Sequence, residues 1–218
     1  MATVVFISGI IAGFVLNIVI KKISSIINNK KDAENIDVND YKKQQNRIMS
    51  RTKNILVILI SAILFLISFL QIGLNIILFK ALVLNSILIV ISFIDIEHEL
   101  IPDKIIIFTL VIGIIFSVID DISLLNAVGG MVFGGGSMLI LAFVPGVLGG
   151  GDIKLMFVLG IFLGFKGTLL ALLLAFITAS IISIVLLVLK IKKRKDYIPF
   201  GPFLSIGSFI AFHFTNIM

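Results

Sequence analysis

The sequence contains no cysteine, and only 14% of its 218 residues are charged. The lack of cysteine excludes a disulfide, a thiolate zinc site and a cysteine-bound iron–sulfur cluster. The low charged fraction excludes an ordinary soluble domain, in which about a quarter of the residues carry charge. Hydrophobic residues make up 59% of the chain, and its mean hydropathy is +1.22. The composition therefore predicts an all-α polytopic integral membrane protein, in which nearly every residue lies in a membrane helix or a connection.

Apolar runs separated by charged or glycine-rich breaks predict about eight transmembrane helices. A membrane span needs about 20 residues, and the fourth and sixth runs are shorter than that. A single helix over the sixth and seventh runs would be about 55 Å long, which is too long for one crossing, so we expect two helices there. The predicted spans are Thr3–Ile20, Asn54–Gln71, Asn75–Ile94, Ile105–Ile119, Ala127–Pro145, Ile153–Phe165, Thr168–Leu189 and Phe200–Asn216.

The basic residues are clustered. Of the 18 Lys and Arg residues, nine lie between Lys21 and Lys53 and five between Lys190 and Lys195. Cytoplasmic loops carry an excess of Lys and Arg, and the even number of predicted spans between the clusters places both on the same side. We therefore predict one membrane-embedded domain over residues 1–218, with an external N-terminus and a short cytoplasmic loop at 21–53. We interpret the polar residues 28–46 as a solvated loop, and the second basic cluster as a contact for lipid head groups, not nucleic acid.

Two aspartates stand at the cytoplasmic ends of predicted spans. Asp95 directly follows a hydrophobic helix, and Asp152 follows the glycine run Gly149–Gly151. Acidic residues at a membrane boundary are costly and suggest a function. Two carboxylates at one depth suit an aspartic protease, because an ionised one takes a proton from water while a protonated one supports the scissile carbonyl. The glycines would let a peptide backbone approach closely. The alternative is a simple turn between helices in which Asp152 is the N-cap.

The other polar residues near these aspartates have less specific patterns. Asp103 and Lys154 either orient the site or bind the substrate backbone, although Lys154 could instead extend to the membrane interface as a snorkelling side chain. Adjacent residues do not converge easily on one metal ion. We therefore interpret Glu97, His98 and Glu99 as solvated loop residues, and we expect no metal site.

Four elements occur in an order that is typical of one enzyme family. Gly149-Gly150-Gly151-Asp152 fits a GxGD motif, and Ile153-Lys154 extends it to GDxK. Asp95 is followed, after a short loop, by the pair Pro102-Asp103. Residues 13–20 read GFVLNIVI, and residues 199–204 read PFGPFL. In this order the elements resemble the type IV prepilin peptidases, which are intramembrane aspartyl proteases.

The resemblance implies an aspartic-type endopeptidase. Its implied substrates are type IV prepilins or pseudopilins, cleaved after a glycine that separates a basic leader peptide from a hydrophobic helix. The implied location is the bacterial cytoplasmic (inner) membrane, with the active site facing the cytoplasm and with membrane lipids as the other partners. No cofactor is expected. The implied residues are Asp95 and Asp152 as the catalytic pair, with Gly149, Gly151, Lys154, Pro102 and Asp103 in supporting or substrate-binding roles.

The chain departs from this family in its first loop. Typical bacterial members carry two zinc-binding CxxC pairs in a larger loop, and many methylate the new N-terminus with S-adenosylmethionine. Because this chain has no cysteine, we predict neither zinc nor methyl transfer.

The rival interpretation is a small proton-coupled transporter with Asp95 and Asp152 as relay carboxylates. Such proteins usually hold their carboxylates near the bilayer midplane, often within inverted repeats. The two aspartates here stand at span ends, and no repeat is visible in the sequence.

Overall fold

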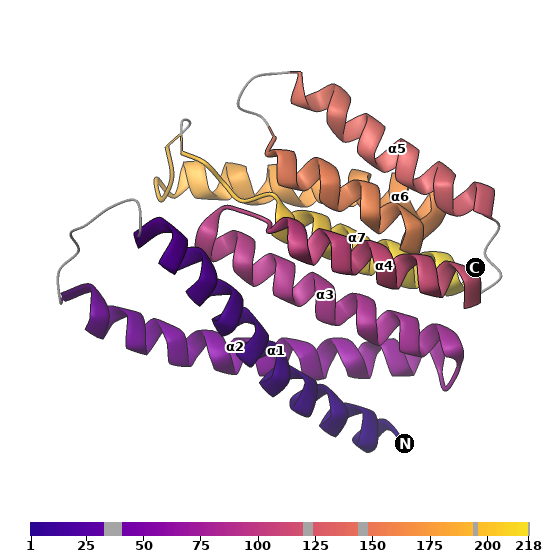
Figure 1. Cartoon of the computed structure of the whole chain (residues 1–218), viewed down its shortest axis with the longest axis horizontal. Helices are drawn as coiled ribbons and strands as arrows, with labels where there is room; N and C mark the ends of the chain where they lie inside the picture. The colour runs from indigo at the N-terminus through magenta and orange to yellow at the C-terminus, as the bar shows by residue number, and fades with distance from the viewer. Residues whose placement is uncertain (33–40, 120–123, 144–147, 194–195, 218) are drawn as a thin grey trace.

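The structure is a computed structural model that describes residues 1–32, 41–119, 124–143, 148–193 and 196–217. Within these ranges the chain is all-α and contains no strand (Figure 1). This confirms the predicted class, an all-α multi-pass membrane protein. The helices are α1 (Ala2–Asp32), α2 (Tyr41–Ile72), α3 (Ile76–His98), α4 (Asp103–Ile119), α5 (Leu124–Ala142), α6 (Gly150–Val188) and α7 (Gly201–Ile217).

Five of the described helices, namely α1, α2, α3, α5 and α6, are long and apolar enough to cross a membrane. The other two, α4 and α7, have 17 residues each. At 1.5 Å per residue, such a helix is about 26 Å long, against a hydrocarbon core of about 30 Å. The predicted number of eight spans therefore stays a prediction.

Helix α6 is interrupted at Gly164. This residue has φ 65° and ψ −178°, a conformation that is open to glycine and strained for other residues. The side-chain oxygen of Asn126 accepts a hydrogen bond of 2.9 Å from the N–H of Phe165, immediately after the break. Figure 1 shows the later part of α6 running back past the earlier part. The structure therefore agrees with the prediction of two helices in this region.

Two predicted boundaries are wrong. The polar residues 28–46 are not simply a loop, because α1 extends to Asp32 and α2 begins at Tyr41; residues 33–40 lie outside the described ranges. Helix α3 also continues past Ile94 to His98, so Asp95 lies on a helix. The physical reason is the same in both places. Extending an existing helix costs far less than starting one, and polar residues such as Lys, Gln and Glu are good helix formers.

The core lies where α3, α6 and α7 meet, and the outer faces are apolar. In lipid the apolar surroundings offer little drive for helix association, so helices pack through close contact and small residues. Gly130 of α5 illustrates this, because the backbone of Gly160 in α6 leaves no room for a Cβ there. Fully buried side chains include Leu84, Ile91, Ile94, Leu155, Leu159, Leu204 and Phe212. Exposed apolar side chains include Phe14, Leu59, Ile107, Leu125 and Ile184.

A buried polar cluster joins α2, α3 and α7. The Ser68 hydroxyl lies 2.8 Å from His213 Nε2 and accepts a hydrogen bond of 2.8 Å from the Asn85 amide. All three side chains are buried. Such hydrogen bonds between membrane helices contribute roughly 0.6 to 2 kcal/mol each. The cluster therefore helps to fix the position of α7, whose first residue reaches the candidate site.

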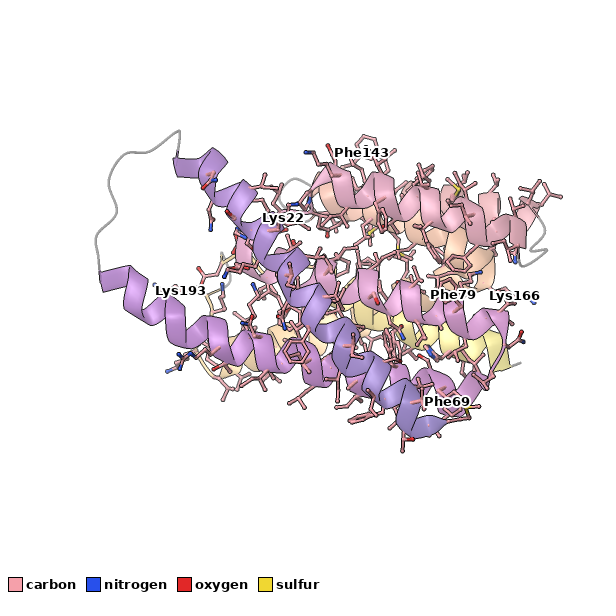
Figure 2. The ribbon with its side chains drawn as sticks, turned by 60° about the horizontal axis from the view of Figure 1, so that its bottom comes forward. Lys22, Phe69, Phe79, Phe143, Lys166 and Lys193 are labelled. Carbon is pink, nitrogen blue, oxygen red and sulfur yellow. The ribbon has the colours of Figure 1, made fainter. Side chains whose placement is uncertain are left out.

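Labelled side chains show where residues of the two basic clusters lie on the bundle. Figure 2 shows Lys22 and Lys193 at one end, with Phe69, Phe79 and Lys166 toward the other. The residues Lys22 and Lys193 come from the two basic clusters; that both clusters face the same side of the membrane stays a prediction. We refer to the end with Lys22 and Lys193 as the basic end.

Candidate active site

Asp95 and Asp152 are buried together at the basic end. Asp95 lies in the last turn of α3 and is 2% exposed, and Asp152 is the third residue of α6 and is 3% exposed. The charge of Asp95 acts on Asp152. The structure thus brings together the two residues that the sequence proposed as a pair, from helices more than fifty residues apart in the chain.

The start of α7 holds Asp95 in place. The N–H of Gly201 donates a hydrogen bond of 2.8 Å to Asp95 Oδ2. A Cβ on Gly201 would stand 2.7 Å from this oxygen and 3.1 Å from Asp95 Cβ and Cγ, so only glycine fits. A carboxylate is also stabilised by the positive end of a helix dipole at this position. The PFGP segment therefore serves to deliver a helix N-terminus to Asp95.

Asp152 is fixed by its own helix start. The N-cap of α6 is Gly149, whose N–H donates a hydrogen bond of 3.3 Å to Asp152 Oδ2. The alternative in which Asp152 itself is the N-cap is therefore wrong in position. Its carboxylate nevertheless satisfies a backbone donor at the helix end, which is a common role for an acidic third residue. This contact orients the Asp152 carboxylate and does not prevent it from taking up or giving a proton.

The glycines before Asp152 differ in their surroundings. A Cβ on Gly149 would lie 3.3 Å from Asp152 Oδ2 and 3.5 Å from the Tyr197 hydroxyl oxygen. A Cβ on Gly151 would lie 3.2 Å from Ile101 Cβ, whereas one on Gly150 would meet nothing within 4 Å. The backbone at Gly150 is therefore not covered by neighbouring atoms. This agrees with the interpretation that Gly149–Gly151, which we call the glycine strip, are accessible to a peptide.

Tyr197 is the residue of this site that the sequence analysis missed. It lies between α6 and α7, and its hydroxyl borders the space next to Gly149. Burial raises the pKa of the Tyr197 hydroxyl, and the charges of Asp152, Asp95 and Glu99 raise that pKa further. The sequence feature that could have pointed to Tyr197 is its position two residues before Pro199, where the PFGP segment (residues 199–202) begins.

A groove of about 1130 Å³ leads to the glycine strip. It runs between α1, α3 and α4, and its walls are mainly apolar. At one end it reaches Gly150 and Gly151. Its lining residues include Leu16, Val19, Ile23, Val83, Ile87, Val90, Ile101, Pro102, Ile105 and Phe108.

Asp103 and Lys154 also line this groove, close to the glycine strip. Lys154 Nζ donates a hydrogen bond of 2.7 Å to Asp103 Oδ1, and both side chains are more than half exposed. The pair links the start of α4 to the first turn of α6. Lys154 thus has a defined partner in this structure.

Glu97 is not the solvated loop residue that the sequence suggested. It lies in the last turn of α3, where it accepts a hydrogen bond of 2.9 Å from the Ser24 hydroxyl and forms an ion pair with Lys53. These contacts join α1, α2 and α3. The neighbouring His98 is buried, while Glu99 is exposed and ends α3 with φ 53°. The described residues contain no group of three or more Asp, Glu or His side chains placed to hold a metal ion.

Comparisons with known proteins bear on the same region of the chain. Residues 82–184 match the type IV leader peptidase family; this range includes both aspartates, the glycine strip and the Asp103–Lys154 pair. A "Prepilin leader peptidase/N-methyltransferase" of Xanthomonas campestris pv. campestris is 35% identical over 69 residues, which are 32% of this chain and 24% of that protein. The alignment thus spans only about a quarter of the relative. No solved structure matches the chain. Within residues 82–184 the family match confirms the resemblance that the Asp95 and GxGD elements indicated.

Proposed function

We propose that this protein, which is similar to the type IV leader peptidases over residues 82–184, is a membrane-embedded aspartic endopeptidase that removes leader peptides from type IV prepilins or pseudopilins. The observation that carries the proposal is the burial of two carboxylates from different helices at one end of the bundle. Both lie inside the matched range, and each is oriented by a backbone N–H. We assign Asp95 and Asp152 as the catalytic pair.

The pair can perform hydrolysis by general acid–base catalysis. Two neighbouring buried carboxylates are costly to ionise together, so we expect them to share one proton. The ionised carboxylate takes a proton from water, which attacks the carbonyl carbon of the scissile peptide. The protonated carboxylate supports the carbonyl oxygen as negative charge develops there. Gly201 and Gly149 keep the two carboxylates fixed, which reduces the cost of reaching this geometry.

The groove supports a substrate that is partly a hydrophobic helix. Its apolar walls extend between α1, α3 and α4, and it ends at the glycine strip beside Asp152. A hydrophobic segment in this groove would bring the peptide that precedes it to Gly150, where the backbone is open. The leader would then lie at the basic end, near Glu99 and Asp103, whose side chains are exposed. We propose that these acidic residues contact the basic leader.

The membrane orientation follows from the charge distribution. Lys22 and Lys193 mark the basic end, and an excess of Lys and Arg favours the cytoplasmic side. We therefore propose that the site faces the cytoplasm of a bacterial inner membrane. The alternative of a proton-coupled transporter is less favoured, because Asp95 and Asp152 lie in terminal turns of α3 and α6 and not in mid-membrane breaks.

The test is co-expression with a candidate prepilin, followed by a gel assay for leader removal. Asp95→Asn and Asp152→Asn should each abolish cleavage while the protein remains folded in the membrane, because the amide keeps the size of the side chain and cannot ionise. Loss of a general acid or base costs about 10² to 10⁴ in rate. Asp32→Asn, at the end of α1, is the matched control and should cleave normally. Asp103→Asn should retain much more activity than either pair variant. Near wild-type cleavage by either pair variant would exclude the aspartic mechanism.

A further inference from the structure

Tyr197 lies near Asp152, in a segment that leads to Asp95. Its hydroxyl oxygen and Asp152 Oδ2 lie 3.5 and 3.3 Å from the same point, the place where a Cβ of Gly149 would stand. Four residues later, the N–H of Gly201 binds Asp95. The short segment 197–201 therefore contacts the surroundings of Asp152 at its start and Asp95 at its end. Because Gly149 has no Cβ, no side chain of this residue stands between the Tyr197 hydroxyl and the Asp152 carboxylate.

We infer that Tyr197 is a catalytic hydrogen-bond donor of this site, whose phenol hydroxyl binds the oxygen of the scissile carbonyl as the tetrahedral intermediate forms. This inference rests on the proposed function. It adds a third polar group to the aspartate pair, from a segment outside the region that matches the leader peptidase family.

The surroundings of Tyr197 suit a donor role. Burial, and in addition the charges of Asp152, Asp95 and Glu99, raise the pKa of the Tyr197 hydroxyl above its usual value, so the hydroxyl keeps its proton at neutral pH. It cannot act as a base there, but it can donate to an oxygen that gains negative charge. The side chain is 40% exposed, so a peptide can reach it.

The backbone around Tyr197 is positioned by local contacts. Lys192 Nζ donates a hydrogen bond of 3.2 Å to the Tyr197 carbonyl oxygen. The N–H of Lys193 donates one of 2.8 Å to the Asp196 carboxylate, and the N–H of Asp196 donates one of 3.0 Å to the carbonyl of Lys193. The segment is thus held on both sides of the tyrosine, by the contacts of Lys193 and Asp196 before it and by Gly201 after it.

The reaction balances with Tyr197 as a donor only. Water forms a bond to the carbonyl carbon and loses one proton to the ionised aspartate, while the carbonyl π electrons move to the oxygen. That oxygen receives a proton from the other aspartate and a hydrogen bond from Tyr197, which keeps its own proton. The C–N bond then breaks as the leaving nitrogen takes a proton from the aspartate that was protonated by water, and a hydroxyl of the intermediate returns a proton to the other aspartate. The pair again holds one proton, and the products are the leader carboxylic acid, which ionises in water, and the mature N-terminal amine.

The test compares Tyr197→Phe, Tyr197→Leu and Tyr41→Phe in detergent-purified full-length protein with a prepilin substrate. Tyr41, at the start of α2, is the only other tyrosine in the chain, so it controls for the chemical change. Removal of one oxyanion donor typically lowers kcat by about 10² to 10³. We expect this loss for both Tyr197 variants, with little change in KM, and no loss for Tyr41→Phe.

The Tyr197→Phe variant removes the hydroxyl and keeps the aromatic ring, so it distinguishes the contributions of the two groups. If Tyr197→Phe cleaves like the wild type, the hydroxyl has no catalytic role and the inference fails, while the proposed function stands. If Tyr197→Leu loses activity and Tyr197→Phe does not, the side chain acts only through the packing of its ring, and the inference also fails. Thermal unfolding of each variant shows whether the fold is intact. An absence of cleavage by the wild type and by Tyr41→Phe would overturn the proposed function and this inference together.

Discussion

Replacement of Gly201 by alanine tests whether the C-terminal segment is part of the active site. The new Cβ would stand 2.7 Å from Asp95 Oδ2 and 3.1 Å from Asp95 Cβ and Cγ. These atoms are buried on a helix, so they cannot move away freely. Either α7 shifts away from α3, or the Asp95 carboxylate rotates and loses its 2.8 Å hydrogen bond from the Gly201 N–H.

The magnitude follows from two opposing effects. Overpacking of a buried site costs about 1 to 3 kcal/mol, and loss of a hydrogen bond to a charged group costs about 1.5 to 3 kcal/mol. The greater helix propensity of alanine contributes at most about 1 kcal/mol in the other direction. The steric effect therefore dominates, and we expect the free energy of unfolding to fall by about 1 to 3 kcal/mol. A misplacement of about 1 Å at a catalytic group costs about 100-fold in rate, so cleavage should fall by at least that factor.

The assay is prepilin cleavage together with thermal unfolding in detergent. The matched control is Gly136→Ala in α5, where a new Cβ would meet nothing within 4 Å. This control should cleave like the wild type and be equally or more stable. If Gly201→Ala retains full activity, Asp95 is not positioned by α7, and the proposed geometry of the site is wrong.

Three further predictions concern orientation, packing and methylation. In this cysteine-free chain, Lys22→Cys and Lys193→Cys should resist a membrane-impermeant thiol reagent applied to intact cells, whereas Lys166→Cys should react; labelling of Lys22→Cys or Lys193→Cys would reverse the proposed orientation. Glu97→Gln should weaken the contacts among α1, α2 and α3 by less than about 1 kcal/mol, because the Glu97 carboxylate is 40% exposed, and most cleavage activity should remain; a complete loss would place Glu97 within the site. Purified protein given prepilin and labelled S-adenosylmethionine should leave the mature N-terminus unmethylated; incorporation of label would show that the cysteine-containing loop is not needed for that reaction.

The sequence by itself was sufficient for the membrane class, and it singled out the two aspartates that we propose as the catalytic pair. Long apolar runs are expected to form membrane helices, because in lipid the backbone N–H and C=O groups of such a run must form hydrogen bonds within their own helix. Asp95 and Asp152 were recognisable because charged residues are rare in such runs, and because the surrounding motifs occur in a family-specific order. The two-helix nature of residues 153–189 was also predictable, since one straight helix would exceed the membrane thickness.

The tertiary structure decided which polar groups surround these aspartates. Periodicity and hydropathy report how one segment meets lipid or water, but not which distant segment lies beside it. For this reason Glu97 was misinterpreted as a loop residue, although it bonds to Ser24 and Lys53 across two other helices. Tyr197 was overlooked for the same reason. Its hydroxyl acquires chemical meaning only because the fold returns the start of α7 to Asp95 and places residue 197 beside Gly149, through contacts between segments about 50 to 100 residues apart.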